Sequence, residues 1–520
     1  MTVRKMDTTP NTYVLFLDMI EIEQLDLVKQ VVNKAKKHPG NPILVNGNVE
    51  DWDASRAANW ASSMAYDDKE KLFKIWYYGT DDGSSVATED YDGNIGYAYS
   101  EDGVNWIKPK LGLHEYKGSK ENNICILGYN KHGGHFNGLI DDYEPDKNKR
   151  FKALASFSTN FDRHDPTGQH SNMGYIPFYS PDGIHWTEGS GPVSWPAGDT
   201  GQIFVDINDS VERRYKSYGQ NGVGSGPDIE NMKEEKEFRA IDPRDGNEQE
   251  IHFVYVMPYS DYYIMLYDFN RYRPFYGQLG YKDFDGHPDP TINTRQKRVK
   301  SRVKLERGDR PSELPEENYG IYTGDIRLAI NRQADSPFTR IQETESVVAR
   351  GNRNEWDNGF LVLGGGSIIP YKDEIYIFYT GITEETASSF PGNYHGRVNM
   401  GLATLRKDGF THLQAKDPLT PGSMTTKAIE CKNTKETELR INCDNLLPWR
   451  NWIEVEVLDG DTGTVIEGYS RQECSPIFNN GLSVKVIWNN ENTLRNIKNK
   501  SIKLRFWMNG DAKLYSFTFK

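Results

Sequence analysis

Acidic residues stand immediately before several of the alternating segments of this sequence, where strands of a β-sheet would begin. NGNVEDWDASRAANW contains Asp53, AGDTGQ contains Asp199, and RNEWDNG contains Glu355 and Asp357. Carboxyl groups brought together from separate strands can hydrolyse a glycosidic bond, because one protonates the leaving oxygen while another acts as nucleophile or activates water. The alternative is that these side chains only cap turns through neighbouring backbone groups.

Glu355 and Asp357 are two residues apart, so on a strand both side chains would face the same side of the sheet. Carboxylates this close tend to share a proton, and the raised pKa of one of them suits a general acid. We therefore predict Glu355 as the general acid and Asp53 or Asp199 as the opposing carboxylate. Asp357 completes the predicted catalytic set by tuning the pKa of its neighbour or positioning the sugar.

Other polar and aromatic residues near these acids would bind sugar hydroxyl groups or stack on a sugar ring. The segment GDIR begins a strand with Asp325, where the matching segments of other repeats carry asparagine, as at Asn94 and Asn399. An acid that replaces a repeated asparagine departs from the pattern and becomes a candidate. The predicted substrate-binding residues are Arg56, His135, Asp141, Asp325, Arg327 and Trp356.

The elements that would position these residues form a long-period repeat. YSEDGVNW at 99–106 returns as YSPDGIHW at 179–186. Asp-Gly between two alternating segments predicts a tight turn, because glycine adopts the positive φ that such a turn needs. The tryptophan that ends each phrase would pack between neighbouring repeats.

A strand with a basic–aromatic pair, preceded by an Asp-rich turn, occurs five times, as in DDKEKLFKIWYYG and EPDKNKRFKALAS. Flanking strands bring each unit to four, with VNWIKP, IHWTEG and FTHLQ as fourth strands and KEFRAID as the third strand of the third unit. Four strands repeated five times predict a five-bladed β-propeller over residues 41–415.

The rest of the chain completes an all-β fold. Residues 421–520 contain about eight short strands with turn signals, which predict a C-terminal β-sandwich after the propeller. Residues 1–40 form an N-terminal extension with a first strand at YVLFL and a short helix within QLDLVKQVVNKAKKHPG (24–40), which Pro-Gly would end.

Composition restricts the partners. The net charge of −13, from 62 basic and 75 acidic residues, argues against nucleic acid and anionic membranes. The sequence has no stretch of about 18 apolar residues, so no membrane-spanning helix is predicted. The N-terminus has no signal-peptide pattern, which predicts a cytoplasmic protein, or a secreted one if a leader was removed.

Metal and cofactor chemistry is not indicated. The four cysteines have no zinc-ligand spacing and are read as reduced, buried thiols. No cofactor is expected. Acidic loops such as DDYEPDKN leave a structural Ca²⁺ as an alternative, but they lack EF-hand spacing.

The chain resembles five-bladed propeller glycosidases related to families 32 and 43, and more closely an uncharacterised family 32-like bacterial branch. The resemblance covers nearly the whole chain and is carried by NPILVNG, GYAYSEDGVNWIKPKLGLHEYKGSKENNI, RFKALAS, GDTGQIFVD, EWDNGFLVLGGG, NMGLATLRKDGFTHLQA, VEVLDGDTGTVIEGYS and LRFWMNGDAKLYSFTF. It implies hydrolysis of a furanosidic glycan, such as a fructoside or an arabinoside, by axial carboxylates. Asp53 or Asp51 would be the base or nucleophile of the first blade, and Asp199 stands in the third blade where the parent families have their acid.

Other functions remain open. The propeller could bind glycans without catalysis, or act as a lyase. A sialidase is another alternative, because SEDGVNW resembles the Asp-box with its glycine one place early. A sialidase would need three arginines around a carboxylate, and Arg56 and Arg327 are two candidates. Two carboxyl groups roughly 5 to 10 Å apart in an axial pocket would favour hydrolysis.

Overall fold

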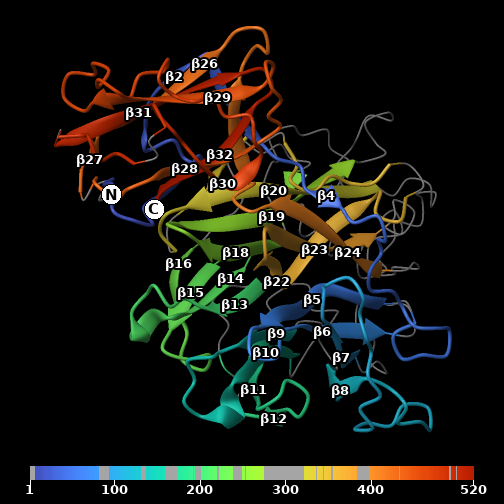
Figure 1. Cartoon of the computed structure of the whole chain (residues 1–520). Coiled ribbons are helices and arrows are strands. Elements are labelled where there is room, and N and C mark those ends of the chain that lie inside the picture. The colour runs from blue at the N-terminus through green and yellow to red at the C-terminus, as the bar shows by residue number, and fades with distance from the viewer. Residues whose placement is uncertain are drawn as a thin grey trace, which may run out of the picture. The chain divides into compact units, whose positions relative to one another are not determined.

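In the computed structural model, strands are the main regular elements of the described residues (Figure 1). Among the described residues the helical elements are two 3-10 turns, η1 (Lys147–Lys149) and η2 (Val211–Arg213), so the predicted all-β fold is confirmed. In this part of the chain no helix is long and apolar enough to cross a membrane. The described residues are 6–54, 56–80, 93–130, 136–158, 173–190, 193, 201–219, 222–237, 249–251, 253–273, 321–334, 337–342, 345–352, 355–382, 398–432, 434–490, 493–498 and 500–520.

The chain divides into two compact units. The central unit comprises Ala35–Ile369 and Tyr376–Thr404. The terminal unit comprises Met1–Lys34, Pro370–Ile375 and Leu405–Lys520, so both ends of the sequence belong to the same unit.

Antiparallel strands that follow one another in the sequence form the sheets of the central unit (Figure 1). Three groups of four have the orders β5-β6-β7-β8, β9-β10-β11-β12 and β13-β14-β15-β16; the first group is one end of a 13-stranded sheet, and the other two are separate sheets. Their strands are β5 (Arg56–Asp67), β6 (Leu72–Thr80), β7 (Gly93–Ser100), β8 (Ile124–Asn130), β9 (Phe136–Ile140), β10 (Phe151–Ser158), β11 (Met173–Ser180), β12 (Thr187–Glu188), β13 (Gly201–Val205), β14 (Tyr215–Gly219), β15 (Gly222–Gly226) and β16 (Lys233–Glu237).

The two remaining strand groups of this unit continue the same order. One is β18-β19-β20-β21, with β17 also on β19, and the other is β22-β23-β24. Short parallel contacts join these groups to each other and to β5, such as Gly324 with Phe360 and Val398 with Arg56. The strands are β17 (Gln249–Glu250), β18 (Val254–Tyr259), β19 (Tyr262–Arg273), β20 (Ile321–Asn331), β21 (Thr339–Arg340), β22 (Phe360–Tyr371), β23 (Glu374–Ile382) and β24 (Val398–Arg406).

Several outer strands differ from the prediction. The third strand of the third sheet is the glycine-rich β15, not KEFRAID, because GVGSG has too few side chains to show alternation. VNWIKP contributes one bridge, between Ile107 and Tyr99, and β8 is the strand that pairs with β7. FTHLQ was predicted next to β24, but the strand that pairs there is β4 (Lys36–Lys37).

The helix predicted within residues 24–40 is wrong. This segment contains β2 (Ile22–Asp26) and β3 (Val28–Val32), separated by Leu27 at a φ of 52°. Val28 and Val32 are buried, and a spacing of four residues places two side chains on one face of a helix or of a strand alike. The β-branched valines and the pairing with a neighbouring strand, which local composition does not reveal, decide for the strand.

The terminal unit has two sheets that share one hydrophobic cluster. One has the order β3-β25-β32-β28-β30, with β1 on β32, and the other β2-β26-β31-β27, with β29 on β31. In β31, alternate residues from Ile502 to Met508 are buried, as expected for one buried sheet face. The further strands are β1 (Tyr13–Leu15), β25 (Thr411–Ala415), β26 (Gly422–Thr426), β27 (Ile429–Glu430), β28 (Leu439–Asp444), β29 (Trp452–Asp459), β30 (Gly481–Lys485), β31 (Ser501–Asn509) and β32 (Lys513–Phe519).

Candidate functional site

Asp53 lies in the turn before β5 and is only 2% exposed. Its Oδ2 accepts hydrogen bonds from the Tyr77 hydroxyl at 2.7 Å and from Lys108 Nζ at 2.6 Å. Burial, and next the charge of Asp53, raise the pKa of Tyr77 well above its usual value, so the tyrosine remains a donor. The Asp53 carboxylate is therefore engaged by a cation and a phenol of its own sheet.

Asp357 has the same surroundings before β22. It is also 2% exposed, and its Oδ2 accepts from the Tyr379 hydroxyl at 2.8 Å and from Lys37 Nζ at 2.5 Å. Burial and the charge of Asp357 raise the pKa of Tyr379. The ammonium of Lys37 lies 5.5 Å from the Tyr379 ring centroid, as that of Lys108 does from the Tyr77 ring.

These two sites are copies of one turn, Gly-Asn-x-x-acid-Trp-Asp, which spans 47–53 and 351–357. Trp52 stacks on Tyr77 with ring centroids 5.3 Å apart, and Trp356 stacks on Tyr379 at 5.7 Å. The first glycine of each copy is required, because a Cβ there would collide with the aspartate carboxylate. Sequence reasoning missed this repeat, although GNVEDWD and GNRNEWD carry it plainly.

Glu355 caps the second copy of this turn. Its carboxylate accepts from the Asn352 backbone N–H at 2.5 Å, and in the first copy Asp51 accepts from Asn48 in the same way at 2.6 Å. The backbone hydrogen bond from Asn352 lowers the pKa of Glu355, whose side chain is exposed. A general acid needs a raised pKa, so this environment does not favour that role.

The expected proton sharing between Glu355 and Asp357 rested on both lying on a strand. β22 begins only at Phe360, so both residues belong to the turn and each has its own hydrogen-bond donors. Trp356, predicted to stack on a sugar ring, instead stacks on Tyr379 and packs on Gly381 and Gly401. The two predicted residues Asp199 and His135 lie outside the described residues.

Of the two predicted arginines, Arg56 begins a strand, whereas Arg327 lies in the middle of β20. Arg56 is the first residue of β5, opposite Thr80 and beside Val398, and its guanidinium carbon lies 4.8 Å from the Tyr78 ring centroid. On β20, Arg327 donates through Nε to Asp325 Oδ1 at 2.7 Å and stacks over the Phe269 ring at 3.9 Å.

Asp325 does occupy the position of a repeated asparagine. The parallel contact of Gly324 with Phe360 corresponds to that of Val398 with Arg56, and the next residues are Asp325 and Asn399. The Asp325 side chain is partly exposed, whereas that of Arg327 is buried. Asp325 and Arg327 thus form an ion pair on β20, the strand that pairs with β22.

Asp141 lies elsewhere. It follows the last residue of β9, and its Oδ2 accepts from Lys152 Nζ at 2.7 Å and from the hydroxyl of Tyr215 on the next sheet. Asp141 was predicted to bind substrate near the acids that precede strands, but it follows β9 and so lies at the opposite end of that strand. Asp206, at the end of β13, accepts in the same way from Tyr263 at 2.5 Å.

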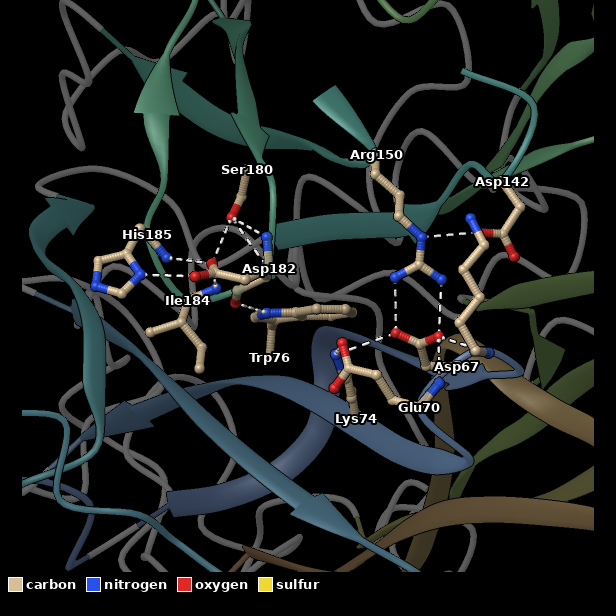
Figure 2. A network of polar contacts seen from close by, with 12 residues as sticks. Asp67, Glu70, Lys74, Trp76, Asp142, Arg150, Ser180, Asp182, Ile184 and His185 are labelled. Carbon is tan, nitrogen blue, oxygen red and sulfur yellow. Dashed lines mark hydrogen bonds and ion pairs between the residues drawn. The ribbon is translucent and has the colours of Figure 1, made fainter. Parts of the chain in front are cut away.

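In β5–β8 the aspartate that corresponds to Asp141 is Asp67, and its partner from the next sheet is an arginine instead of a tyrosine. Asp67, the last residue of β5, accepts two hydrogen bonds from Arg150, next to β10, and lies 3.1 Å from Lys74 Nζ (Figure 2). The residue after Arg150 is Phe151, which has no hydroxyl to donate. The aspartates that begin these Asp-rich turns, Asp67 and Asp141, therefore contact the next sheet, whereas Lys74 and Lys152 of the basic–aromatic pairs contact the aspartate of their own sheet.

The two repeated phrases are turns built around an aspartate. Asp182 Oδ1 accepts from the backbone N–H groups of Ile184 and His185, both at 2.8 Å, and Figure 2 shows this turn beside Trp76. These hydrogen bonds outweigh burial, which acts in the opposite sense, and lower the pKa of Asp182 to about 2. Gly183 has a φ of 81°, and Gly103 of the first phrase one of 78°, as predicted.

The tryptophan of each phrase packs on a neighbouring group of strands. Trp186 lies edge-on to Trp76 of β6, with centroids 5.8 Å apart, and Trp106 lies edge-on to Phe378 of β23 at 6.1 Å. The Trp76 indole also donates to the Gly183 carbonyl at 2.6 Å. These turns connect neighbouring sheets through their tryptophans. Their aspartates, Asp102 and Asp182, accept the backbone hydrogen bonds that hold each turn in shape.

Within the described ranges, no group of three or more His, Cys, Asp or Glu residues could hold a metal ion.

Several solved structures are similar to the chain. A glycosyl hydrolase from Bacteroides ovatus is 13% identical, with a TM-score of 0.42 over 72% of this chain and 94% of that chain. A glycoside hydrolase family 43 arabinoxylan arabinofuranohydrolase from Bacillus subtilis, in complex with cellotetraose, is 12% identical, with a TM-score of 0.34 over 94% and 99% of the two chains. No protein-family model and no curated protein matches the sequence.

Proposed function

We propose that the chain is a glycoside hydrolase whose central unit is a five-bladed β-propeller and whose terminal unit is a β-sandwich. Each blade would be one of the five strand groups, with β4 as the last strand of the fifth. The parallel contacts of β22 and β24 with β5 support this assignment, because neighbouring blades of a ring would meet there. The shared hydrophobic cluster supports the sandwich.

The observation that carries the proposal is a set of buried polar side chains where β5, β7 and β24 begin. Arg56 is 5% exposed, and Thr80, opposite it, is buried as well. Asn94 and Asn399, the second residues of β7 and β24, are also buried. Burying polar groups costs free energy, so an arginine, a hydroxyl and two amides at one edge favour a site for a hydroxyl-rich ligand.

In this site Arg56 and Arg327 would bind sugar hydroxyl groups. Asp325 would be one of the two reacting carboxylates, because it is partly exposed and paired with Arg327 at a position where the repeat has an amide. Asp199, which the sequence places before β13, would be the other. We assign Asp53 and Asp357 to holding the strand beginnings, and the substrate to furanosidic glycans, as the resemblance implies.

The test is a hydrolysis screen with aryl furanosides and pyranosides, fructans and arabinans. We expect turnover by the wild type, a loss of 100-fold or more in Asp325→Asn and Asp199→Asn, and an unchanged rate in the control Asp68→Asn, an exposed acid of the same unit. No hydrolysis by the wild type, or full activity in both variants, would reject the proposal.

A second candidate is a glycan-binding protein without catalysis. It is favoured by the hydrogen bonds that already occupy Asp53, Asp357 and Glu355. Binding of a glycan that Arg56→Ala abolishes, with no turnover of that glycan, would establish this function instead.

A further inference from the structure

We propose that the terminal unit carries a second, non-catalytic site, in which the outer face of the five-stranded sheet binds a neutral polysaccharide. The site consists of Trp449, Trp452, Phe478 and Trp507 around Arg471, and we call it the tryptophan face. It is separate from the site proposed in the central unit, and its residues all belong to the terminal unit.

The exposure and backbone conformation of Trp449 are the first evidence for a binding role. Its side chain is 88% exposed and its φ is 66°, a conformation that bulky residues rarely adopt. The turn that holds it is closed by hydrogen bonds from the N–H groups of Arg450 and Asn451 to the carbonyl of Leu447. A large aromatic side chain kept in water by a fixed, unfavourable turn indicates a binding role.

The strand register brings the other aromatic residues together. Trp452 begins β29, and the antiparallel bridge between Ile453 and Ile477 places Phe478 opposite Trp452. The Trp449 ring lies 5.8 Å from the ring of Phe478. Trp507 on β31 is opposite Glu454, so it lies diagonally across from Trp452 on the same face.

Arg471 joins the two strands of this face. Its guanidinium carbon lies 4.9 Å from the Trp452 ring centroid and 4.6 Å from that of Trp507, and its Nε donates to Glu454 at 2.6 Å. The guanidinium thus holds both indoles in place through cation–π contacts. A surface ordered before the ligand arrives loses less entropy on binding.

A second set of hydrogen bonds fixes Trp507. Glu456 Oε1 accepts from the Trp507 indole at 3.2 Å and from Arg505 at 3.0 Å, and Arg505 also donates to Thr425 at 3.0 Å. Groups of this kind, a carboxylate and a guanidinium beside an aromatic plane, can meet sugar hydroxyls while the ring covers the apolar sugar face.

The charges on this face select the class of ligand. Arg471 pairs with Glu454 and Arg505 with Glu456, and at the rim Lys503 pairs with Glu23 at 2.7 Å. Each cation on the sheet is therefore balanced by a carboxylate. A phosphate- or carboxylate-rich ligand would need uncompensated cations, so a neutral polysaccharide fits this face and an acidic one does not.

The experiment is native affinity electrophoresis of the full chain in gels that contain a β-glucan, xylan, mannan, arabinan or fructan, with polygalacturonate as the acidic comparison. We expect at least one neutral polysaccharide to retard the wild type. Trp449→Ala and Trp452→Ala should weaken that binding at least tenfold. Leu419→Ala, which removes a side chain that is 89% exposed in the same unit, should not.

Two further measurements distinguish a loss of binding at the tryptophan face from unfolding and from an effect on the site in the central unit. Thermal unfolding of each variant checks that it is folded, and Asp325→Asn should lose hydrolysis while keeping full retardation, which separates the two sites. Retardation only by polygalacturonate, no retardation at all, or equal retardation of Trp449→Ala and wild type would overturn the proposal. A dimer in solution that Trp449→Ala dissociates would also overturn it, because the face would then bind a second copy of the chain.

Discussion

Asp67 and Arg150 form a buried, two-pronged ion pair between neighbouring sheets, with Nη1 and Nη2 of the arginine 2.8 and 2.7 Å from the two carboxylate oxygens. Burial alone would raise the pKa of Asp67, but the hydrogen bonds from Arg150 and Lys74 outweigh it and hold that pKa well below its usual value. The carboxylate is therefore charged and fully enclosed, and it is the one fully buried anion of a network that also contains Lys74, Glu70 and Asp142.

We expect Asp67→Asn to lower the free energy of unfolding by about 3 kcal/mol, because it removes the buried anion that Arg150 and Lys74 share and leaves them only the more exposed carboxylates of Asp142 and Glu70. Asp68→Asn, which changes an exposed acid next to it, should stay within about 0.5 kcal/mol of the wild type. Urea unfolding at neutral pH measures both. Equal stabilities of the two variants would contradict the role given to the ion pair.

The lysines of the duplicated turn should be equivalent in effect. Lys37→Met and Lys108→Met each leave a buried aspartate, Asp357 or Asp53, without its cation, at an expected cost of about 3 kcal/mol. The exposed lysine Lys110 gives the control Lys110→Met, which should cost almost nothing. If only one of the first two variants is destabilised, the two turns do not serve the same purpose.

Gly183 should not tolerate a side chain. Gly183→Ala places a Cβ 2.7 Å from the Trp76 ring at a φ of 81°, so strain and collision add. Gly112→Ala meets a similar φ of 70° with nothing within 4 Å and reports the backbone effect alone, about 1 kcal/mol. Thermal melting should place Gly183→Ala clearly below Gly112→Ala, and coincident melting curves would disprove the contact.

His412 should make the terminal unit sensitive to acid. Burial lowers the pKa of this histidine from 6.5 to about 4, and its ring nitrogens contact Asn33 and Gln414. Between these pH values the unfolded chain binds a proton that the folded chain does not, so stability falls as the pH drops from 6.5 to 4, by up to about 3 kcal/mol.

The measurement is the free energy of unfolding at pH 7.5 and pH 5 for the wild type and His412→Gln. The variant removes the proton-binding group, so its stability should depend less on pH. The exposed residue His185 provides the control His185→Gln, which should keep the wild-type dependence. An unchanged pH dependence in His412→Gln would exclude this histidine as the cause.

Glu355 offers a test of the site itself. Because its exposed carboxylate caps a turn, we expect Glu355→Gln to hydrolyse within about twofold of the wild type. A loss of 100-fold or more would restore Glu355 as the general acid that the sequence predicts.

Features with a local chemical cause were predictable. The turns at Gly103 and Gly183 follow from Asp-Gly between alternating segments, and the packing of Trp106 and Trp186 follows from their place after those turns. Asp325 stood out because the repeat supplied a reference residue at its position.

Features that depend on distant partners were not predictable. β3 is a strand because it pairs with β25, almost 400 residues later in the sequence numbering, and no local pattern carries that information. Acids before strands looked catalytic, yet Asp53 and Asp357 are engaged by lysines from other segments. A sequence shows that an acid precedes a strand, but not which cation will reach it.

The strand β4 and the residues after it have a consequence for biosynthesis. Asn41 contacts Leu402, 361 residues later in the chain. At a synthesis rate of roughly 5 to 20 residues per second, this segment waits about 20 to 70 s for its partner strand to leave the ribosome. During that interval the nascent chain carries β4 without β24, the strand with which it pairs in the folded protein.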